Sequence, residues 1–198
     1  RKSKSEWCSA LRVVDKPDNS IRITIDYKPL NKVIKGDSYP LPSIEDLYNK
    51  LSKADTFTKI DLKSAYHQVP IDEESIKYTA FICEFGLFEY LSMPMGIKTA
   101  PSWFQRFIEN ALEMFIKQNL IRVYLDDLIV FTNSKINGLK HHEKVVIDVI
   151  ETLRKPSLKI SYDKCTPVVN EINLLGNTIS ENQIKPNPER ALCLMEKD

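Results

Sequence analysis

Two adjacent acidic residues, Asp126 and Asp127, stand between two apolar stretches within residues 121–131. Adjacent carboxylates in apolar surroundings repel each other and lose hydration, so a compensating group is expected. A hairpin that needs only a turn is better served by Asn-Gly or Asp-Gly. The simplest compensating group is a divalent cation such as Mg²⁺, which binds few protein carboxylates and completes its shell with water and substrate phosphate. A solvated surface turn is the alternative, and the pair alone does not decide between the two.

A pair of bound ions would give these residues a defined chemistry. Two ions about 3.5–4 Å apart can hold the attacking and leaving oxygens of an in-line phosphoryl displacement. Asp61 is a candidate third carboxylate, because it ends the short strand-like stretch 57–60 and can meet the pair across a sheet. Its competing role is the N-cap of a helix over residues 62–67, and the local sequence by itself favours that role.

Strands are predicted on both sides of these acidic residues. Residues 57–60 form one, and the apolar residues before and after Asp126 and Asp127 form two more. The β-prone residues 11–14 and 21–25 flank Pro17-Asp18-Asn19-Ser20, a turn sequence that predicts a hairpin. Further strands are predicted at residues 78–83 and 87–92, around Gly86, and at residues 158–161 and 172–180.

Two predicted helices show clear apolar periodicity. Residues 101–118 repeat apolar side chains every four positions, and residues 139–154 form the second helix. Ser43 is expected to cap a helix that begins at Ile44, and residues 186–188 lead into a last short helix. Strands and helices that interleave, with hairpins, predict an α+β fold in which helices cover one side of a sheet.

Composition limits the classes of protein to which the chain can belong. The 198 residues include 28 basic and 27 acidic side chains, and the net charge of +1 neither indicates nor excludes a nucleic-acid binder. Four scattered cysteines give no zinc-ligand spacing and no disulfide framework, so a reducing compartment is expected. Neither a membrane span nor a signal peptide is predicted. On a helix, His141 and His142 would point to different faces, so the pair is not expected to bind a metal.

A resemblance to a known family joins these features. Residues 124–127, Tyr-Leu-Asp-Asp, resemble the YxDD box of reverse transcriptases. Residues 61–68, Asp-Leu-Lys-Ser-Ala-Tyr-His-Gln, resemble the first catalytic-aspartate block of gypsy-type long-terminal-repeat retrotransposons. Further blocks follow the family order at residues 26–32, 39–42, 93–105 and 174–180, and residues 184–186 follow the last of them. Together these blocks cover the chain from about Trp7 onward.

The resemblance implies a fold and its division into domains. It implies an α+β, reverse-transcriptase-like fingers and palm, with a mixed or antiparallel palm sheet backed by helices. The fingers are expected at residues 1–55 and 70–100, and the palm at residues 56–69 and 101–198. The chain is expected to be a fragment of a Pol polyprotein, with thumb, connection and RNase H domains downstream.

The resemblance also assigns roles to residues. Asp61, Asp126 and Asp127 would be catalytic and would bind two Mg²⁺ ions, for which Mn²⁺ can substitute, with the backbone carbonyl of Leu62 as an extra ligand. Tyr66 would stack under the incoming sugar and exclude a ribose 2′-OH, although an ordinary core aromatic is its alternative role. The other residues implied to bind the nucleotide are Lys16, Arg22 and Met95, and those implied to contact template or primer are Pro94, Gly96, Tyr124, Leu175 and Gly176.

Some positions depart from the family pattern. Residues 15–19, Asp-Lys-Pro-Asp-Asn, stand where the family carries a more basic fingers turn, so Lys16 has a solvated turn lysine as its alternative role. Met95, Thr99 and Asn177 stand where Phe, Asn and His are common.

The implied activity is RNA-directed DNA polymerisation by two-metal phosphoryl transfer. Its implied partners are an RNA or DNA template with a primer, deoxynucleoside triphosphates and the downstream domains. The implied location is a cytoplasmic retroelement particle, without a membrane. The alternative is a catalytically inactive or domesticated remnant that binds nucleic acid or a protein partner. Polymerases that make RNA, or that copy only DNA, share the palm chemistry, but Tyr66 and the order of the blocks disfavour them.

Overall fold

The structure is a computed structural model that describes residues 1–15 and 20–187. It divides into two compact units, the first made of Arg1–Pro40 with Ser64–Arg106 and the second of Leu41–Lys63 with Phe107–Asp198. These bounds differ from the expected ones at three places: residues 64–69 and 101–106 fall in the first unit, and residues 41–55 fall in the second. Residues 41–55 include helix α2 (Ile44–Leu51), whose Leu47 and Leu51 lie in a core cluster with Phe57.

The first unit contains a four-stranded sheet in the order β2-β1-β4-β5. Strands β1 (Ser9–Asp15) and β2 (Ile21–Asp26) pair antiparallel, which confirms the predicted hairpin, while most of its predicted turn lies outside the described residues. Strands β4 (Phe81–Cys83) and β5 (Gly86–Phe88) are shorter than predicted. Residues Lys77–Thr79 form a 3-10 turn, and the Thr79 hydroxyl accepts the Tyr90 backbone N–H at 2.9 Å, so neither end continues the pairing.

Further helical segments of this unit are α1 (Lys28–Val33), the 3-10 turn η1 (Ala65–Gln68) and α3 (Glu73–Ile76). Helix α4 (Ala100–Ala111) begins in the first unit and ends in the second. The predicted single helix over residues 101–118 is wrong in one respect, because α4 ends at Ala111 and α5 (Glu113–Lys117) follows as a separate helix. Leu112, between them, has φ −109° and a fully buried side chain. Burial of this side chain therefore coincides with the break in the helix.

The second unit is built on an antiparallel sheet in the order β6-β7-β3-β8. The strands are β6 (Ile121–Tyr124), β7 (Asp127–Thr132), β3 (Thr56–Asp61) and β8 (Thr166–Val169). A smaller sheet, β11-β10-β9, comprises β9 (Glu171–Leu174), β10 (Asn177–Ser180) and β11 (Gln183–Pro186). The predicted strand at residues 158–161 is wrong, since only an isolated bridge from Leu62 to Ile160 occurs there. The last predicted helix lies outside the described residues.

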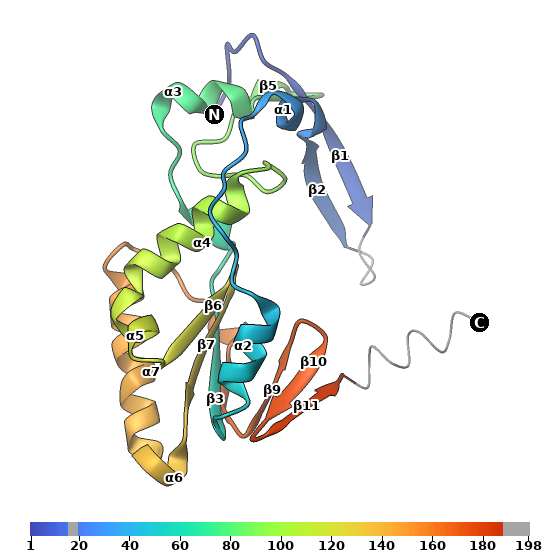
Figure 1. Cartoon of the computed structure of the whole chain (residues 1–198). Helices are drawn as coiled ribbons and strands as arrows, with labels where there is room; N and C mark the ends of the chain where they lie inside the picture. Colours follow the sequence, from blue (N-terminus) through green and yellow to red (C-terminus); the bar gives the residue numbers. More distant parts are fainter. Residues whose placement is uncertain (16–19, 188–198) are drawn as a thin grey trace, which may run out of the picture. The chain divides into compact units, whose positions relative to one another are not determined.

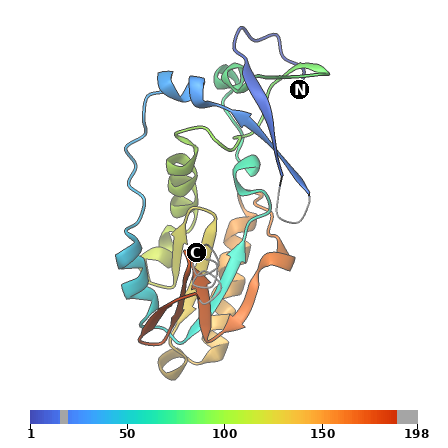
Figure 2. The same cartoon turned by 90° about the vertical axis from the view of Figure 1, so that its right-hand side faces the viewer.

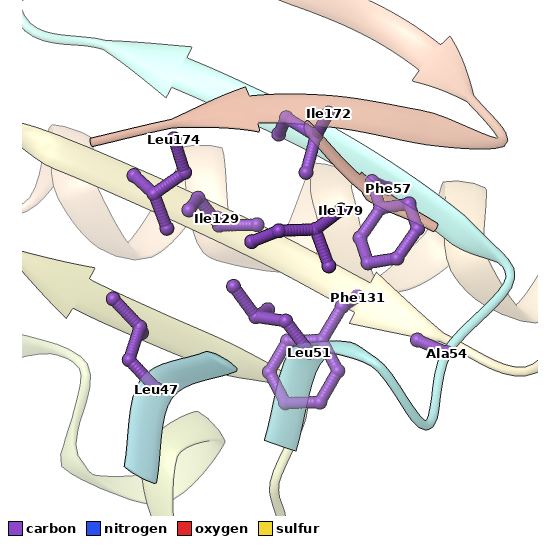
Figure 3. Close-up of a cluster of buried hydrophobic side chains, with 9 residues drawn as sticks. All are labelled: Leu47, Leu51, Ala54, Phe57, Ile129, Phe131, Ile172, Leu174 and Ile179. Carbon is purple, nitrogen blue, oxygen red and sulfur yellow. The ribbon is translucent and has the colours of Figure 1, made fainter. Parts of the chain in front are cut away.

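Both faces of the larger sheet are covered, which corrects the expectation of helices on one side. Helix α7 (Leu139–Arg154) covers one face, while α2 and the smaller sheet lie on the other (Figures 1 and 2). Figure 3 shows the second face, where Phe57, Ile129 and Phe131 of the sheet meet Leu47 and Leu51 of α2. The cause is that β3 and β7 carry buried side chains at successive positions, so both faces need cover.

Among the described residues, no helix is long and apolar enough to cross a membrane.

A buried histidine joins α7 to the sheet. His142 is fully buried, its Nε2 lies 2.9 Å from the Thr58 hydroxyl and its Nδ1 lies 2.9 Å from the Thr132 hydroxyl. Burial lowers the pKa of His142, and the neighbouring His141 lowers it further. The neutral imidazole is thus the form that the folded protein accommodates.

Stability should therefore depend on pH. The unfolded chain takes up a proton on His142 near its ordinary pKa of 6.5, whereas the folded protein resists this uptake. The stabilisation is fully present above pH 6.5 and is lost as the pH falls below it, so the urea midpoint should be lower at pH 5.5 than at pH 7.5. His142→Gln should shrink the difference, while the control His141→Gln should keep most of it, because burial is the main cause of the lowered pKa. An undiminished difference in His142→Gln would contradict this assignment.

Candidate active site

The acidic pair lies at the tip of a tight hairpin in the second unit. Tyr124 pairs with Asp127 at the end of the β6–β7 ladder, which leaves Leu125 and Asp126 as a two-residue loop. Leu125 has φ +56°, a left-handed conformation that costs a branched side chain roughly 1–3 kcal/mol. Asp126 is exposed and Asp127 is half-buried. A strained loop that carries one acid, with a second acid at the start of the next strand, differs from the Asn-Gly or Asp-Gly loop expected of a simple turn.

Asp61 lies directly opposite Asp127 in the β3–β7 register. Its competing role as a helix N-cap is wrong. The residues after it form the short turn η1, which begins at Ala65 and has Ser64 (φ +50°) at its cap position. The structure therefore brings two carboxylates face to face across neighbouring strands, with a third in the adjoining loop.

Backbone contacts fix Asp61 and the residue that follows it. The Ser161 N–H donates to the Asp61 carbonyl at 2.9 Å, and the Asp61 N–H donates to Cys165 Sγ at 3.4 Å. Leu62, the predicted extra ligand, is buried and forms a bridge with Ile160. Asp61 is thus held at the end of its strand through both its backbone N–H and its backbone carbonyl.

Charge around the three carboxylates is partly balanced by lysine. Burial raises the pKa of Asp61; the positive charge of Lys164 opposes this effect, and the negative charge of Asp126 adds to it. Lys59 Nζ lies 2.5 Å from Asp127 Oδ1. Like charges that face each other across a sheet are destabilising, so this ammonium offsets a repulsion that the register creates.

The donor chemistry of the site fits a divalent cation. Carboxylate oxygens are the ligands that Mg²⁺ prefers. One of these carboxylates, that of Asp127, already contacts a positive charge, the ammonium group of Lys59. Within residues 1–15 and 20–187, however, no three or more Asp, Glu, His or Cys side chains converge closely enough to hold a metal ion. Asp127 is engaged by Lys59 instead.

The other predicted residues of the second unit have structural contacts. Tyr124 and Leu175 pack against the core cluster drawn in Figure 3. Leu175 and Gly176, both with positive φ, make the turn between β9 and β10. Asn177, which stands where the family commonly has His, donates from Nδ2 to the Tyr48 hydroxyl at 2.8 Å. The β9–β10 turn is thereby tied to helix α2.

The predicted nucleotide-binding residues belong to the first unit. Arg22 is exposed on β2, whereas Lys16 lies outside the described residues. Tyr66 is half-buried and packs against Phe104, with ring centroids 5.0 Å apart. This contact is compatible with both roles considered for Tyr66, because a ring packed on one side can still present an edge to a ligand.

The loop that carries Met95 is clamped by one asparagine. Asn31 Nδ2 donates to the Gly96 carbonyl at 2.8 Å, and Asn31 Oδ1 accepts the Lys98 N–H at 2.7 Å. Gly96 has φ +94°, which a residue with a side chain would adopt only with strain. Met95 is 55% exposed and Pro94 is buried, so Met95 is available to a ligand while Pro94 shapes the loop.

The first unit also contains an apolar cavity of about 790 Å³. Its walls include Trp7, Leu30, Tyr78, Met93 and Trp103, but not Tyr66, Arg22 or Met95. The predicted nucleotide-binding residues therefore do not line this cavity.

Sequence reasoning missed Lys59 and His142. Lys59 had a signal, because it stands two positions before Asp61 in a strand and must share its face. For His142 the sequence offered only the adjacent His141 as a signal, and its threonine partners come from two different strands, 84 and 10 residues away along the chain.

A family model and the similar curated proteins indicate the same kind of protein. Residues 14–179 match the family described as reverse transcriptase (RNA-dependent DNA polymerase). The chain is 40% identical, over 98% of its length, to the retrovirus-related Pol polyprotein from transposon 297 of Drosophila melanogaster. It is 39% identical, over 96% of its length, to the transposon Tf2-3 polyprotein of Schizosaccharomyces pombe. The chain spans only 18% and 14% of the lengths of these two relatives.

Solved structures agree in fold. A foamy viral protease-reverse transcriptase in complex with double-stranded DNA matches with a TM-score of 0.88 at 22% identity, over 98% of this chain and 33% of that one. The same kind of protein in complex with an RNA/DNA hybrid matches with a TM-score of 0.87 at 22% identity, over 98% of this chain and 25% of that one. The expected α+β architecture is thus confirmed.

Proposed function

The chain belongs to the reverse transcriptase family, and from that premise we propose that it forms the fingers and palm of an RNA-directed DNA polymerase. The first compact unit is assigned to the fingers and the second to the palm. One observation carries the proposal: Asp61 faces Asp127 across β3 and β7, beside the loop that presents Asp126. The polymerase would act as part of a longer Pol polyprotein with thumb, connection and RNase H domains, in a cytoplasmic retroelement particle.

The proposed reaction is the addition of a deoxynucleotide to a primer. The primer 3′-OH attacks the α-phosphorus of a deoxynucleoside triphosphate, the bond to the bridging oxygen breaks, and pyrophosphate leaves. Asp61, Asp126 and Asp127, with the Leu62 carbonyl, would hold two Mg²⁺ ions, or Mn²⁺ in their place. When bound, such ions favour deprotonation of the attacking hydroxyl and neutralise charge on the transferred phosphoryl group.

The hairpin contributes geometry to this reaction. A two-residue loop leaves Asp126 little backbone freedom, and the pairing of β3 with β7 fixes the other two carboxylates on one edge of the sheet. Catalysis by positioning requires such rigidity, because binding energy is otherwise lost to ordering the site.

Binding of the nucleotide is assigned to the fingers. Arg22 is exposed, and its planar guanidinium suits phosphate oxygens; Lys16 would add a second cation. Met95 would pack against the nucleotide. Tyr66, supported from one side by Phe104, would lie under the sugar and exclude a ribose 2′-OH.

Template and primer are assigned to a further set of residues, Pro94, Gly96, Tyr124, Leu175 and Gly176. Foamy viral protease-reverse transcriptases of this fold have known structures in complex with double-stranded DNA and with an RNA/DNA hybrid, which supports duplex binding by analogy. Contacts to the phosphate backbone should dominate, so affinity should fall steeply with salt and vary little with sequence.

Primer extension tests the proposal. The chain, joined to the thumb, connection and RNase H segments proposed above, should extend a labelled DNA primer on an RNA template with deoxynucleotides and Mg²⁺. Ribonucleotides should support little extension, because of Tyr66. Binding of the duplex is measured in parallel by fluorescence anisotropy. Normal binding without extension, in Mg²⁺ and in Mn²⁺, would contradict the proposal and favour a non-catalytic remnant.

A further inference from the structure

Lys59 has an unusual position for a lysine. It lies in β3 between Phe57 and Asp61, and alternation in a strand puts these three side chains on one face of the sheet. Phe57 is fully buried in the core cluster on that face. The Lys59 side chain therefore starts beside an apolar core and runs toward the carboxylate edge of the sheet.

The ammonium group reaches the carboxylate on the neighbouring strand. Lys59 is opposite Ile129 in the register, and its Nζ lies 2.5 Å from Asp127 Oδ1, diagonally across the ladder. The two side chains are only 22% and 24% exposed. Partial burial weakens solvent screening, so this pair interacts more strongly than the ion pairs on the protein surface.

We propose that Lys59 is a positioning residue that serves as the internal counter-ion of Asp127 and must release this carboxylate when divalent ions enter the site. The inference rests on the proposed function, since it assumes that Asp127 belongs to the metal site. It accounts for two observations together, namely the Lys59–Asp127 contact and the lack of convergence of the acidic side chains in the described structure.

The charge of Lys59 should affect stability and metal affinity in opposite directions. The lysine stabilises the metal-free site by balancing two facing carboxylates, and it competes with a metal ion for one of them. Removal of its charge should therefore make the metal-free protein less stable and its metal affinity higher. A lysine that serves only the packing of the strand would lower stability without raising metal affinity.

Direct binding of Mn²⁺ to the 198-residue chain, followed by the electron paramagnetic resonance signal of the free ion, measures this effect. Lys59→Met keeps most of the stem and removes the charge, so Mn²⁺ should bind roughly fivefold or more tightly. Lys59→Arg keeps the charge and should bind like the parent. The matched control is Lys50→Met, which breaks the exposed Lys50–Asp46 pair of the same unit and should leave binding unchanged.

A measurement on the unchanged chain covers the case in which Lys59→Met does not fold. Acetylation of lysines, read by mass spectrometry, should become faster at Lys59 when Mg²⁺ is added, while Lys50 keeps its rate. Unchanged or slower acetylation of Lys59 at saturating Mg²⁺ would overturn the proposal. So would Mn²⁺ binding by a folded Lys59→Met protein that is equal to or weaker than that of the parent.

Mn²⁺ binding by two further variants distinguishes an error in the proposed metal site from an error in the role of Lys59. Asp61→Asn and Asp126→Asn should each weaken Mn²⁺ binding if the carboxylates form a metal site. If neither substitution affects binding, the metal site itself is wrong. If both weaken binding but Lys59→Met does not strengthen it, only the role of Lys59 is wrong.

Discussion

Replacement of Asp126 by Asn should lower the rate of nucleotide addition by roughly a hundredfold to a thousandfold or more, with duplex binding unchanged. Asn has the shape of Asp but no charge, so it can neither neutralise a divalent ion nor support the charge that develops in the transition state. Asp126 is exposed in a two-residue loop, and among the described contacts it supports no buried group. The loss should therefore fall on chemistry and not on folding.

Single-turnover primer extension checks this prediction, because it separates the chemical step from product release. The matched control is Asp148→Asn, a half-buried position on α7 whose side chain lies outside the acidic site. Its rate should equal that of the parent. Equal rates in Asp126→Asn and the parent would place the activity elsewhere, in a contaminant or in another part of the protein.

The positions of the three carboxylates were largely predictable from sequence because they depend on local sequence patterns. Two apolar strands around Asp126 and Asp127 determine a hairpin, and a strand that ends at Asp61 offers one more carboxylate. The competing N-cap role of Asp61 could not be excluded from sequence. It depended on where the next helical turn begins, and Ser64 in a left-handed conformation places that start at Ala65.

Features that depend on long-range packing were not predictable in the same way. A four-residue periodicity continues through Leu112, yet the helix breaks there while the side chain stays buried. Helix α2 was expected with the fingers, but its leucines pack on Phe57 and Phe131. The partner of Lys59, Asp127, and one partner of His142, Thr58, lie far from them along the chain. A local pattern contains no information on such partners.

Strand β3 links the core of the second unit to its acidic edge, since Phe57 and Asp61 lie on the same face four residues apart. Phe57 is fully buried among Leu47, Leu51 and Ile129, with other apolar side chains around them (Figure 3). Phe57→Ala should therefore lower the free energy of unfolding by about 3–5 kcal/mol, because it removes buried apolar surface and leaves a cavity. This is a large part of the roughly 5–15 kcal/mol typical of a folded domain.

Unfolding in guanidinium chloride, followed by circular dichroism, measures the change caused by Phe57→Ala. The control is Ile136→Ala in the same unit, where a side chain 80% exposed should contribute less than about 0.5 kcal/mol. A loss below about 1 kcal/mol for Phe57→Ala would mean that the core closes around the gap.

Since the register of β3 against β7 depends on this core, Phe57→Ala should also weaken Mn²⁺ binding, although no carboxylate is changed. Lys59→Met, by contrast, should destabilise the protein and strengthen Mn²⁺ binding. The opposite directions of these two effects distinguish a residue that builds the site from one that balances its charge.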